Sequence, residues 1–382
     1  MSKDSVPTGR RIAIDAHMVG TGETGNETYV RGLVRGLRAI DARPDYLLYT
    51  TDPALLPPAL VGDRFRPRRI TPAGNIPRLA WAMPRAARRD RLDLLHVTYT
   101  LPPALPCRGV VSVHDISYTF FPEAFSPRDR LVLGLAVPLS LRRAERVITP
   151  SESGRRDIIR RYRVPEWKIA VIPLAAEPHF APVRDPAELA RVRARYRLPA
   201  RYVLAVGNLQ PRKNLGRLIA AFAALRAARR TDVGLVLVGK ALWREPDIFT
   251  AVRAHGLEGA VVATGYVPDA DLPALYSAAE VFAYPSLYEG FGLPPVEAMA
   301  CGTPVLTSAT SSLPEVVGDA ALTVDPRDVR AIAAGLEALL GDADLRVRLA
   351  GAGRARAIRF TWEETARRTL AVYEAALVGA RR

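Results

Sequence analysis

The feature that most constrains the fold is an alternation of short β-branched runs with segments of helical period. In the first half of the chain the strand-like runs are RIAIDA (11–16), YLLYT (46–50), DLLHV (93–97), GVVSV (109–113) and RVITP (146–150). In the second half they are YVLAVG (202–207), VGLVLVG (233–239), AVVATG (260–265), VFAYP (281–285), PVLTS (304–308) and ALTVD (321–325). Segments such as LGRLIAAFAALRAA (215–228) lie between them with a period near 3.6. This order predicts an α/β protein with parallel sheets and right-handed crossovers.

The length of 382 residues and a hydrophobic fraction of 49% are sufficient for two domains. The stretch 175–200 has four prolines and no strand-like run, which indicates a linker. We therefore expect two doubly wound, Rossmann-like domains at 1–178 and 179–360, facing a central cleft. The segment 361–382 is predicted as a helix that returns to the first domain, with Thr361 and Glu364 placed as a capping box.

Targeting and redox signals are weak in this sequence. The apolar run 131–141 is shorter than a membrane span and contains Pro138. The N-terminus lacks the apolar core of a signal peptide, so a cytoplasmic location is expected. Cys107 and Cys301 have no metal-type spacing, and both are expected to be reduced and structural.

The formal charge of +15 has two readings. It can attract nucleic acid or an acidic membrane, or it can follow from composition, because lysine occurs only at positions 3, 168, 213 and 240 and arginine supplies the rest. The densest clusters are 64–70 and 78–93. Each is either a solvated helix face or a peripheral contact with the inner membrane surface or a lipid phosphate. We expect no nucleic-acid partner.

A first candidate anion site follows the strand-like run 202–207. The next residues bring Gly207, Arg212 and Lys213 to the carboxyl end of the strand, with Asn214 as a helix N-cap. Two adjacent cations beside a helix start suit a diphosphate. Ordinary surface charge is the alternative, and the scarcity of lysine favours a functional reading of Lys213.

A second candidate segment is PSLYEGFGLPPVEAMACGTPV (285–305). It places Glu289 and Glu297 eight positions apart around a glycine turn. Backbone amides are available from Gly290 to Leu293, whereas Pro294 and Pro295 have none to donate, so anion-binding donors are expected on the turn itself. The glycine stretch 20–30 is a weaker candidate because it does not match a dinucleotide fingerprint.

Metal binding is not predicted. Asp269 and Asp271 form an Asp-x-Asp pattern, but Pro273 in the following turn favours helix capping. The histidines at 17, 96, 114, 179 and 255 have no i, i+4 spacing. His96 and His114 both end strand-like runs, where a merely polar histidine is the ordinary reading.

The segment 265–326 resembles the donor-binding half of the retaining glycosyltransferases of family 4, which have the GT-B fold. PRKN (211–214), VHDIS (113–117) and PSES (150–153) extend the resemblance over nearly the whole chain. It implies a nucleotide-diphosphate sugar as co-substrate and no further cofactor.

The resemblance also implies roles for individual residues. Glu297 would bind the ribose hydroxyls, Arg212 and Lys213 the diphosphate, and Glu289 the hydroxyls of the transferred sugar. The residues implied in donor binding are Gly25, Gly207, Arg212, Lys213, Tyr266, Val267, Glu289, Gly290, Phe291, Gly292, Leu293 and Glu297. Tyr266 and Val267 would lie beside the base, whereas Gly25 stands in GNETY, which departs from the commoner Gly-Ile-Gly-Arg-Tyr.

On the same resemblance, His114, with Glu289, Arg212 and Lys213, would act at the reacting sugar. Glu289 is interpreted as a positioner, and a donor phosphate oxygen would take the acceptor's proton. The subgroup resembles mannosyl- and rhamnosyltransferases of polysaccharide assembly, so GDP-mannose is the first expected donor. A glycan or lipid-linked acceptor would contact Trp81, Tyr99 and His114.

Three alternatives stay open. A UDP- or dTDP-sugar would make the chain a glucosyl- or rhamnosyltransferase. Another GT-B activity, such as a sugar phosphorylase or an epimerase, would keep the nucleotide or phosphate site. A non-catalytic binder of an anionic polymer would ignore nucleotide sugars and lose affinity steeply with salt.

Overall fold

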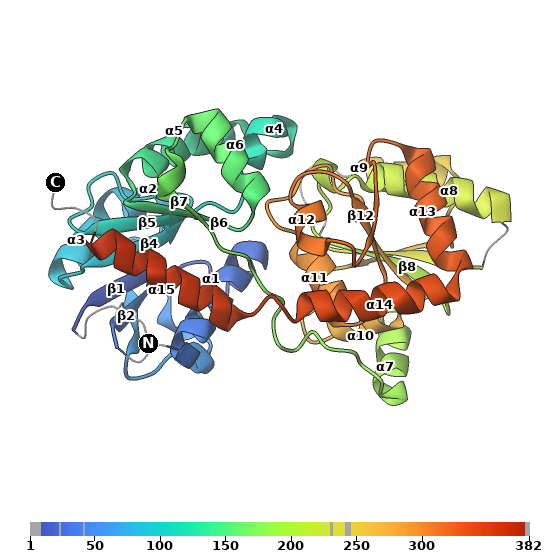
Figure 1. Ribbon diagram of the computed structural model, residues 1–382, viewed down its shortest axis with the longest axis horizontal. Coiled ribbons are helices and arrows are strands. Elements are labelled where there is room, and N and C mark those ends of the chain that lie inside the picture. The colour runs from blue at the N-terminus through green and yellow to red at the C-terminus, as the bar shows by residue number, and fades with distance from the viewer. Residues whose placement is uncertain (1–8, 23, 41–42, 230–231, 241–245, 379–382) are drawn as a thin grey trace. The chain divides into compact units, whose positions relative to one another are not determined.

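The computed structural model describes residues 9–22, 24–40, 43–229, 232–240 and 246–378. The chain divides into two compact units: unit 1 comprises Met1–Ala175 and Phe360–Arg382, and unit 2 comprises Ala176–Arg359 (Figure 1). Residues 1–8, which belong to the N-terminus for which no signal peptide is predicted, and Glu23 of the glycine stretch 20–30 lie outside the described residues.

Unit 1 is built on a parallel sheet with the strand order β3-β2-β1-β4-β5-β6-β7. Its strands are β1 (Arg11–Asp15), β2 (Asp45–Thr50), β3 (Phe65–Arg69), β4 (Leu94–Thr98), β5 (Arg108–Ser112), β6 (Arg146–Thr149) and β7 (Ile169–Val171). The order reverses between β1 and β4, which pair in parallel through Ile12–Leu94 and Ile14–His96. Such a reversal is where doubly wound sheets bind ligands beyond their carboxyl ends.

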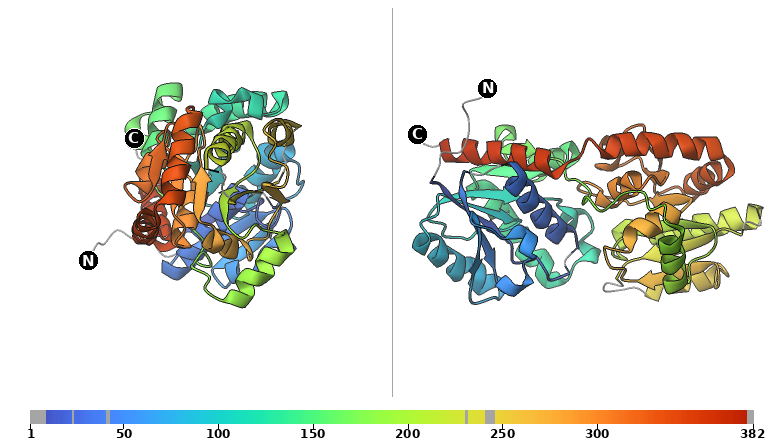
Figure 2. Two further views of the ribbon diagram at one scale, coloured as in Figure 1. Left: turned by 90° about the vertical axis from the view of Figure 1, so that its right-hand side faces the viewer. Right: turned by 90° about the horizontal axis from the view of Figure 1, so that it is seen from below.

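Helices cover both faces of this sheet (Figure 2). They are α1 (Thr24–Ile40), α2 (Asn75–Pro77), the π-helix η3 (Arg78–Ala82), α3 (Met83–Arg89), α4 (Ser117–Phe120), α5 (Pro127–Arg143), α6 (Glu152–Tyr162) and α15 (Trp362–Val378). Short 3₁₀ turns occur at η1 (Pro53–Leu55), η2 (Pro58–Leu60), η4 (Pro122–Ala124) and η5 (Glu166–Lys168). The C-terminal helix α15 packs along α1.

Unit 2 has a second parallel sheet with the order β10-β9-β8-β11-β12-β13. Its strands are β8 (Tyr202–Val206), β9 (Gly234–Val238), β10 (Val261–Gly265), β11 (Val281–Tyr284), β12 (Val305–Ser308) and β13 (Leu322–Val324). Its helices are α7 (Pro186–Tyr196), η6 (Pro211–Lys213), α8 (Leu215–Arg229), α9 (Pro246–Ala254), α10 (Leu272–Ala278), α11 (Leu293–Ala300), α12 (Leu313–Val317), α13 (Val329–Gly341) and α14 (Ala343–Ala357). The order reverses between β8 and β11, so the loops after these two strands lie side by side.

Each unit has its own hydrophobic core between sheet and helices. In unit 1 Val111 and Val147 of the sheet pack in one cluster with Leu141 of α5. In unit 2 Leu235 of β9 packs in one cluster with Phe222 of α8 and Leu336 of α13. β4 and β9 are buried along their whole length, as expected for central parallel strands covered on both faces.

The structure confirms the predicted α/β class, and each predicted strand lies within its predicted range or one residue from it. Two strands were missed. The cluster 64–70, for which a solvated helix face was one of two interpretations, contains the edge strand β3 instead of a helix. Pro67 is tolerated there because no further strand pairs with the open edge of β3. β7 is only three residues long and has too little pattern to detect.

The predicted linker 175–200 contains a helix, and one capping prediction needs correction. Within this stretch α7 starts at Pro186, because Asp185 accepts a hydrogen bond from the Ala187 amide. At α15, Thr361 caps the helix by accepting from the Glu364 amide at 3.1 Å. The carboxylate of Glu364 does not complete the box, because it pairs with Arg367 and Arg368 instead.

Within the described residues, no helix combines the length and the apolar character that a membrane crossing needs.

Candidate functional site

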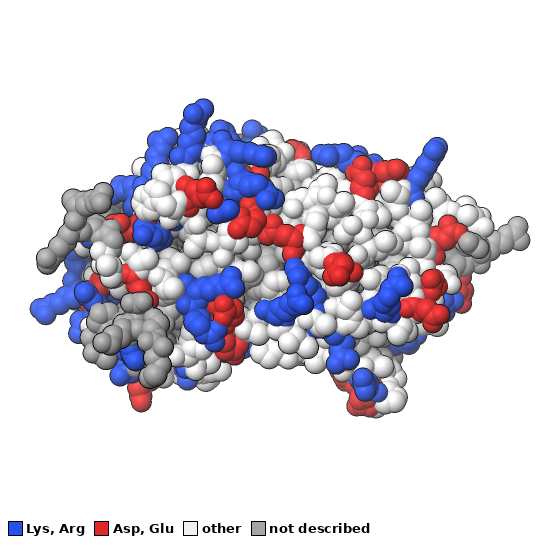
Figure 3. Space-filling view, in the orientation of Figure 1, with Lys and Arg blue, Asp and Glu red and all other residues white. Residues whose placement is uncertain are grey.

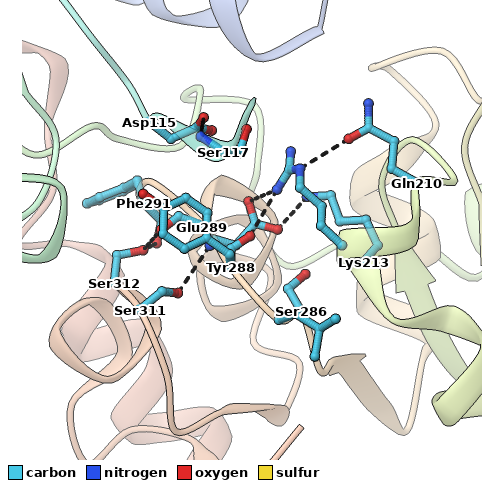
Figure 4. Close-up of polar contacts among 12 residues, drawn as sticks. Asp115, Ser117, Gln210, Lys213, Ser286, Tyr288, Glu289, Phe291, Ser311 and Ser312 are labelled. Carbon is cyan, nitrogen blue, oxygen red and sulfur yellow. Dashed lines mark hydrogen bonds and ion pairs between the residues drawn. The ribbon is translucent and has the colours of Figure 1, made fainter. Parts of the chain in front are cut away.

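Three charged side chains meet at the carboxyl edge of the unit 2 sheet. Arg212 and Lys213 belong to η6 after β8, and Glu289 belongs to the loop after β11. Arg212 Nη1 lies 2.7 Å from Glu289 Oε2, and Lys213 Nζ lies 2.6 Å from Glu289 Oε1 (Figure 4). The three groups form one cluster with an excess positive charge at the topological switch point of this sheet.

The electrostatics of this cluster keep Glu289 ionised. Burial alone would raise the pKa of this carboxyl, but Arg212 and Lys213 outweigh burial and hold the pKa at about 2. Tyr284 donates its hydroxyl to Glu289 Oε1 at 2.9 Å. Burial and the Glu289 charge raise the pKa of Tyr284 well above its ordinary value, so its phenol stays protonated.

The loop that carries the two cations is anchored by Asn214. The Asn214 backbone has φ +62°, and Nδ2 donates to the carbonyls of Pro285 at 2.9 Å and Pro326 at 2.6 Å. This corrects the predicted N-cap role: Asn214 precedes α8, but its Oδ1 accepts from Arg217 Nη1. The Leu287 amide also donates to the Arg212 carbonyl, so backbone groups as well as the ion pairs join the loops after β8 and β11.

The glycine turn between Glu289 and α11 is held by serines of the next loop. The Glu289 amide donates to Ser311 Oγ at 3.1 Å, and Ser312 Oγ donates to the carbonyls of Glu289 and Phe291 (Figure 4). Gly292 has φ +111°, and a Cβ there would lie 2.7 Å from Leu313 Cδ2, so only glycine fits. Gly290 precedes this turn, and α11 begins at Leu293, which orients its first amides as a helix N-terminus does for anions.

Glu297 lies on α11 in a different electrostatic environment from Glu289. Tyr276 of α10 donates to Glu297 Oε2 at 2.9 Å. Burial, with added repulsion from Asp269 and Glu177, raises the pKa of Glu297 to about 7. The two glutamates of the pattern therefore differ: Glu289 is ionised, whereas Glu297 is partly protonated near neutral pH.

Other predicted donor residues lie nearby in unit 2. Gly207 directly follows β8 with φ +145° and lines a small cavity with Lys213, Tyr284 and Pro285. Tyr266 is half exposed, and Lys240 Nζ lies 4.7 Å from the centre of its ring. Val267 is buried, so its side chain packs in the interior.

The remaining predicted residues belong to unit 1. His114 follows β5, and its Nε2 is buried with no hydrogen-bond partner among the described residues. Burial lowers the pKa of His114 to about 4, so its ring is neutral at pH 7. The rings of Tyr29 and Tyr99 meet it edge-on at 4.5 and 5.9 Å. Trp81 of η3 is exposed with Arg85 stacked 4.5 Å from its ring, and Gly25 lies exposed at the start of α1.

The predicted capping role of the Asp-x-Asp pattern is wrong. Asp271 stands at the N-cap position of α10 but makes no capping hydrogen bond. Its carboxylate instead contacts Arg191, Arg195 and Tyr196 of α7. Among the described residues, no group of three or more His, Cys, Asp or Glu side chains is arranged to hold a metal ion.

Sequence reasoning missed Tyr284 and Ser311. Tyr284 was included in an apolar strand, and the only available signal was its position as the last residue of β11 at the ligand-binding edge. Ser311 is a non-glycine residue with φ +55°, which a local pattern of serines and threonines does not reveal.

Comparison with known proteins identifies the class that this fold and site define. A family model described as glycosyl transferases group 1 matches residues 190–356, and one described as Glycosyltransferase Family 4 matches residues 24–180. The chain belongs to the family 4 glycosyltransferases, which have the GT-B fold.

Individual relatives agree with this assignment. The chain is 40% identical over 301 residues to O-antigen chain mannosyltransferase B of Escherichia coli, a match that covers 78% of this chain and 77% of that protein. Sucrose-phosphate synthase from Thermosynechococcus elongatus has a TM-score of 0.78 and 26% identity, covering 97% of this chain and 100% of that one. HepE of Anabaena, solved with UDP and glucose, has a TM-score of 0.74 and 21% identity over 96% of this chain and 100% of that chain, which shows the shared fold.

Proposed function

We propose that this glycosyltransferase moves a mannosyl group from GDP-mannose to a glycan or lipid-linked acceptor, with retention of the anomeric configuration. The observation that carries the proposal is the cluster of Arg212, Lys213 and Glu289 at the carboxyl edge of the unit 2 sheet. The choice of mannose rests on the 40% identity to an O-antigen chain mannosyltransferase.

In this proposal Arg212 and Lys213 bind the diphosphate and stabilise the charge that develops on it as the bond from sugar C1 breaks. Both cations are already held in place by Glu289, Tyr284 and the Tyr288 carbonyl. Preorganised charge of this kind needs little rearrangement during reaction, and one such group typically contributes about 10²–10³ in rate. Gly207 and the amides of Gly290, Phe291, Gly292 and Leu293 border the same anion.

Glu289 positions the sugar in this scheme. Its ionised carboxylate can accept hydrogen bonds from sugar hydroxyls, while its charge is shared with two cations and a phenol. A carboxylate stabilised in this way is a weak nucleophile, which argues against a covalent glycosyl intermediate. A phosphate oxygen of the donor is the proposed acceptor of the proton that the incoming hydroxyl loses.

The nucleoside is assigned to the neighbouring part of unit 2. Glu297 accepts hydrogen bonds from the ribose hydroxyls in its ionised form, and Tyr276 orients it from the other oxygen. Tyr266, with its exposed ring beside Lys240, is the proposed contact of the base, next to Val267.

Unit 1 is the proposed acceptor domain. His114 offers a neutral ring whose buried Nε2 has no hydrogen-bond partner among the described residues, so this atom can bond a sugar hydroxyl. Trp81 and Tyr99 supply aromatic surface for a glycan. Gly25 would let the donor phosphate approach the start of α1.

We further propose that the reaction needs no metal ion or other cofactor, because Arg212 and Lys213 supply positive charge at the leaving phosphate. Incubation with a chelator should leave turnover within about twofold of the untreated enzyme. Complete loss of activity on chelation, restored by added Mg²⁺ or Mn²⁺, would overturn this part of the proposal.

The direct test is a screen of GDP-, UDP- and dTDP-sugars for release of the nucleoside diphosphate by the purified chain. We expect GDP-mannose to give the highest rate and the product to keep the α configuration of the donor by proton NMR. Release from a UDP- or dTDP-sugar instead would replace the donor, an inverted product would overturn retention, and release from no donor would reject the proposed activity.

A further inference from the structure

Helix α5 of unit 1 presents an apolar face to solvent. Leu131, Leu135 and Leu139 recur at four-residue spacing and are 65%, 67% and 47% exposed, and Val132 beside them is 42% exposed. The opposite side of the helix is already used, because Val137, Ser140 and Leu141 are buried against the sheet. α5 is apolar on both sides, but the protein covers only one of them. The exposed apolar side is therefore a surface on which a binding partner can be expected.

Arginines border this apolar face at both ends of the helix. Arg128 and Arg130 lie in the first turn, and Arg142 and Arg143 lie in the last turn. Within the described part of the chain, no ion pair joins these four arginines to a carboxylate, and the only acid on α5 is Asp129, which is bound to the capping Ser126. The face is therefore both apolar and positively charged.

The C-terminal end of α5 adds an exposed tryptophan. Lys168 Nζ donates to the Arg142 carbonyl at 2.7 Å, which places the neighbouring Trp167 close to the end of the helix. Trp167 is 69% exposed, and the guanidinium of Arg146 stacks 5.0 Å from its ring. Lys and Arg side chains gather on this side of unit 1 in the space-filling view, over the helices α5 and α6 (Figure 3).

The basic cluster 64–70 is less suited to bind an anionic surface. In β3, Arg66 pairs with Asp45, Arg68 with Asp90 and Arg69 with Asp52. Their charge is largely compensated within unit 1, and β3 exposes no row of leucines. The arginines of α5 lack such partners among the described residues and flank apolar side chains.

We infer that the exposed face of α5, with Trp167, is a docking surface for a membrane that contains anionic phospholipid. Leucines at this spacing can enter the headgroup boundary while the terminal arginines contact lipid phosphates and Trp167 lies at the interface. The charge distribution favours a lipid surface over a second copy of this chain, because two such faces would bring their arginines together. The inference stands on unit 1 and does not depend on the proposed donor.

Sedimentation with vesicles tests this surface on the full chain. The unmodified protein should bind vesicles of mixed phosphatidylglycerol and phosphatidylcholine, bind phosphatidylcholine alone much more weakly, and lose affinity as salt rises. The combined change Leu131→Gln, Leu135→Gln and Leu139→Gln should weaken binding by about tenfold or more. Arg142→Gln with Arg143→Gln should weaken binding and reduce its salt dependence.

A matched control is available in unit 2, where Val347 and Ile358 are 73% and 74% exposed. Val347→Gln with Ile358→Gln should leave vesicle binding unchanged, and thermal stabilisation by GDP should be the same in all variants. Equal vesicle binding by the triple leucine variant and the unmodified protein would overturn the inference. A dimer in analytical ultracentrifugation that the leucine changes dissociate, without vesicle binding, would also overturn it in favour of a second copy.

Discussion

At the scale of single residues, Glu289 and Lys213 share one hydrogen-bonded ion pair but are assigned separable roles in our proposal. Lys213 carries charge toward the donor phosphate, whereas Glu289 both orients the cations and accepts from the sugar in our proposal. A ligand without the sugar, such as GDP, should depend on the first role only.

We predict that Glu289→Gln lowers turnover about 10²-fold or more but leaves GDP binding equal or tighter. The amide keeps the volume of the carboxylate while removing a negative charge from the neighbourhood of the diphosphate. Initial rates and GDP titration measure the two effects, with Arg359→Ala on the exposed surface as the control. Loss of GDP binding in Glu289→Gln with unchanged turnover would contradict the division of roles.

The raised pKa of Glu297 predicts that the stability of the protein depends on pH. Its pKa of about 7 in the folded chain lies above the ordinary value of 4.5, so the folded state holds this proton more tightly. The resulting stabilisation is fully present below about pH 4.5 and is lost as pH rises through about 7.

Glu297→Gln lacks this titration and does not lose the stabilisation as pH rises. The melting temperature of Glu297→Gln, relative to that of the unmodified protein, should therefore increase between pH 5 and pH 8. Thermal melts of both proteins across this range measure the difference, and the comparison removes the contribution of every other group. A difference that does not change with pH would show that Glu297 titrates normally.

At the scale of elements, the contact between α1 and α15 fixes the C-terminal helix on unit 1. A Cβ at Gly36 would lie 2.2 Å from the Trp362 carbonyl oxygen, a backbone atom that cannot rotate away. Gly36 therefore permits the close approach of the two helices.

Gly36→Ala should destabilise the protein by about 1–3 kcal/mol, because the helices must separate to admit the methyl group. Gly134→Ala on α5 is the matched control: no atom lies within 4 Å of its Cβ, and removing a helical glycine should stabilise by about 0.5–1 kcal/mol. Urea unfolding monitored by circular dichroism measures both changes. Equal changes in the free energy of unfolding for the two substitutions would indicate that α1 and α15 can move apart at little cost in stability.

The regular elements could be predicted because parallel strands are buried on both faces and leave continuous apolar runs. β3 escaped detection because three of its five residues are arginine, and β7 because it is too short. Asn214 and Asp271 were both assigned as helix caps, and both stand at cap positions. Their side chains bond to distant segments instead, which a local rule based on neighbours cannot anticipate.

At the scale of the whole molecule, the family resemblance indicates which loops form the candidate site. It supplied Arg212, Lys213 and Glu289 but not the ion pair that joins them, because residues 76 positions apart reveal contact only through the sheet order. The opposite pKa shifts of Glu289 and Glu297 also follow from packing and not from sequence.

The central claim is that Arg212 and Lys213 hold the diphosphate of a nucleotide sugar, and GDP-dependent thermal stabilisation tests it most directly. The melting temperature of the unmodified protein should rise with GDP concentration and saturate, as it should in Arg359→Ala. Lys213→Ala should fold but require about tenfold or more GDP for the same rise, since it loses one charge-assisted contact. Identical GDP curves for Lys213→Ala and the unmodified protein would contradict the account.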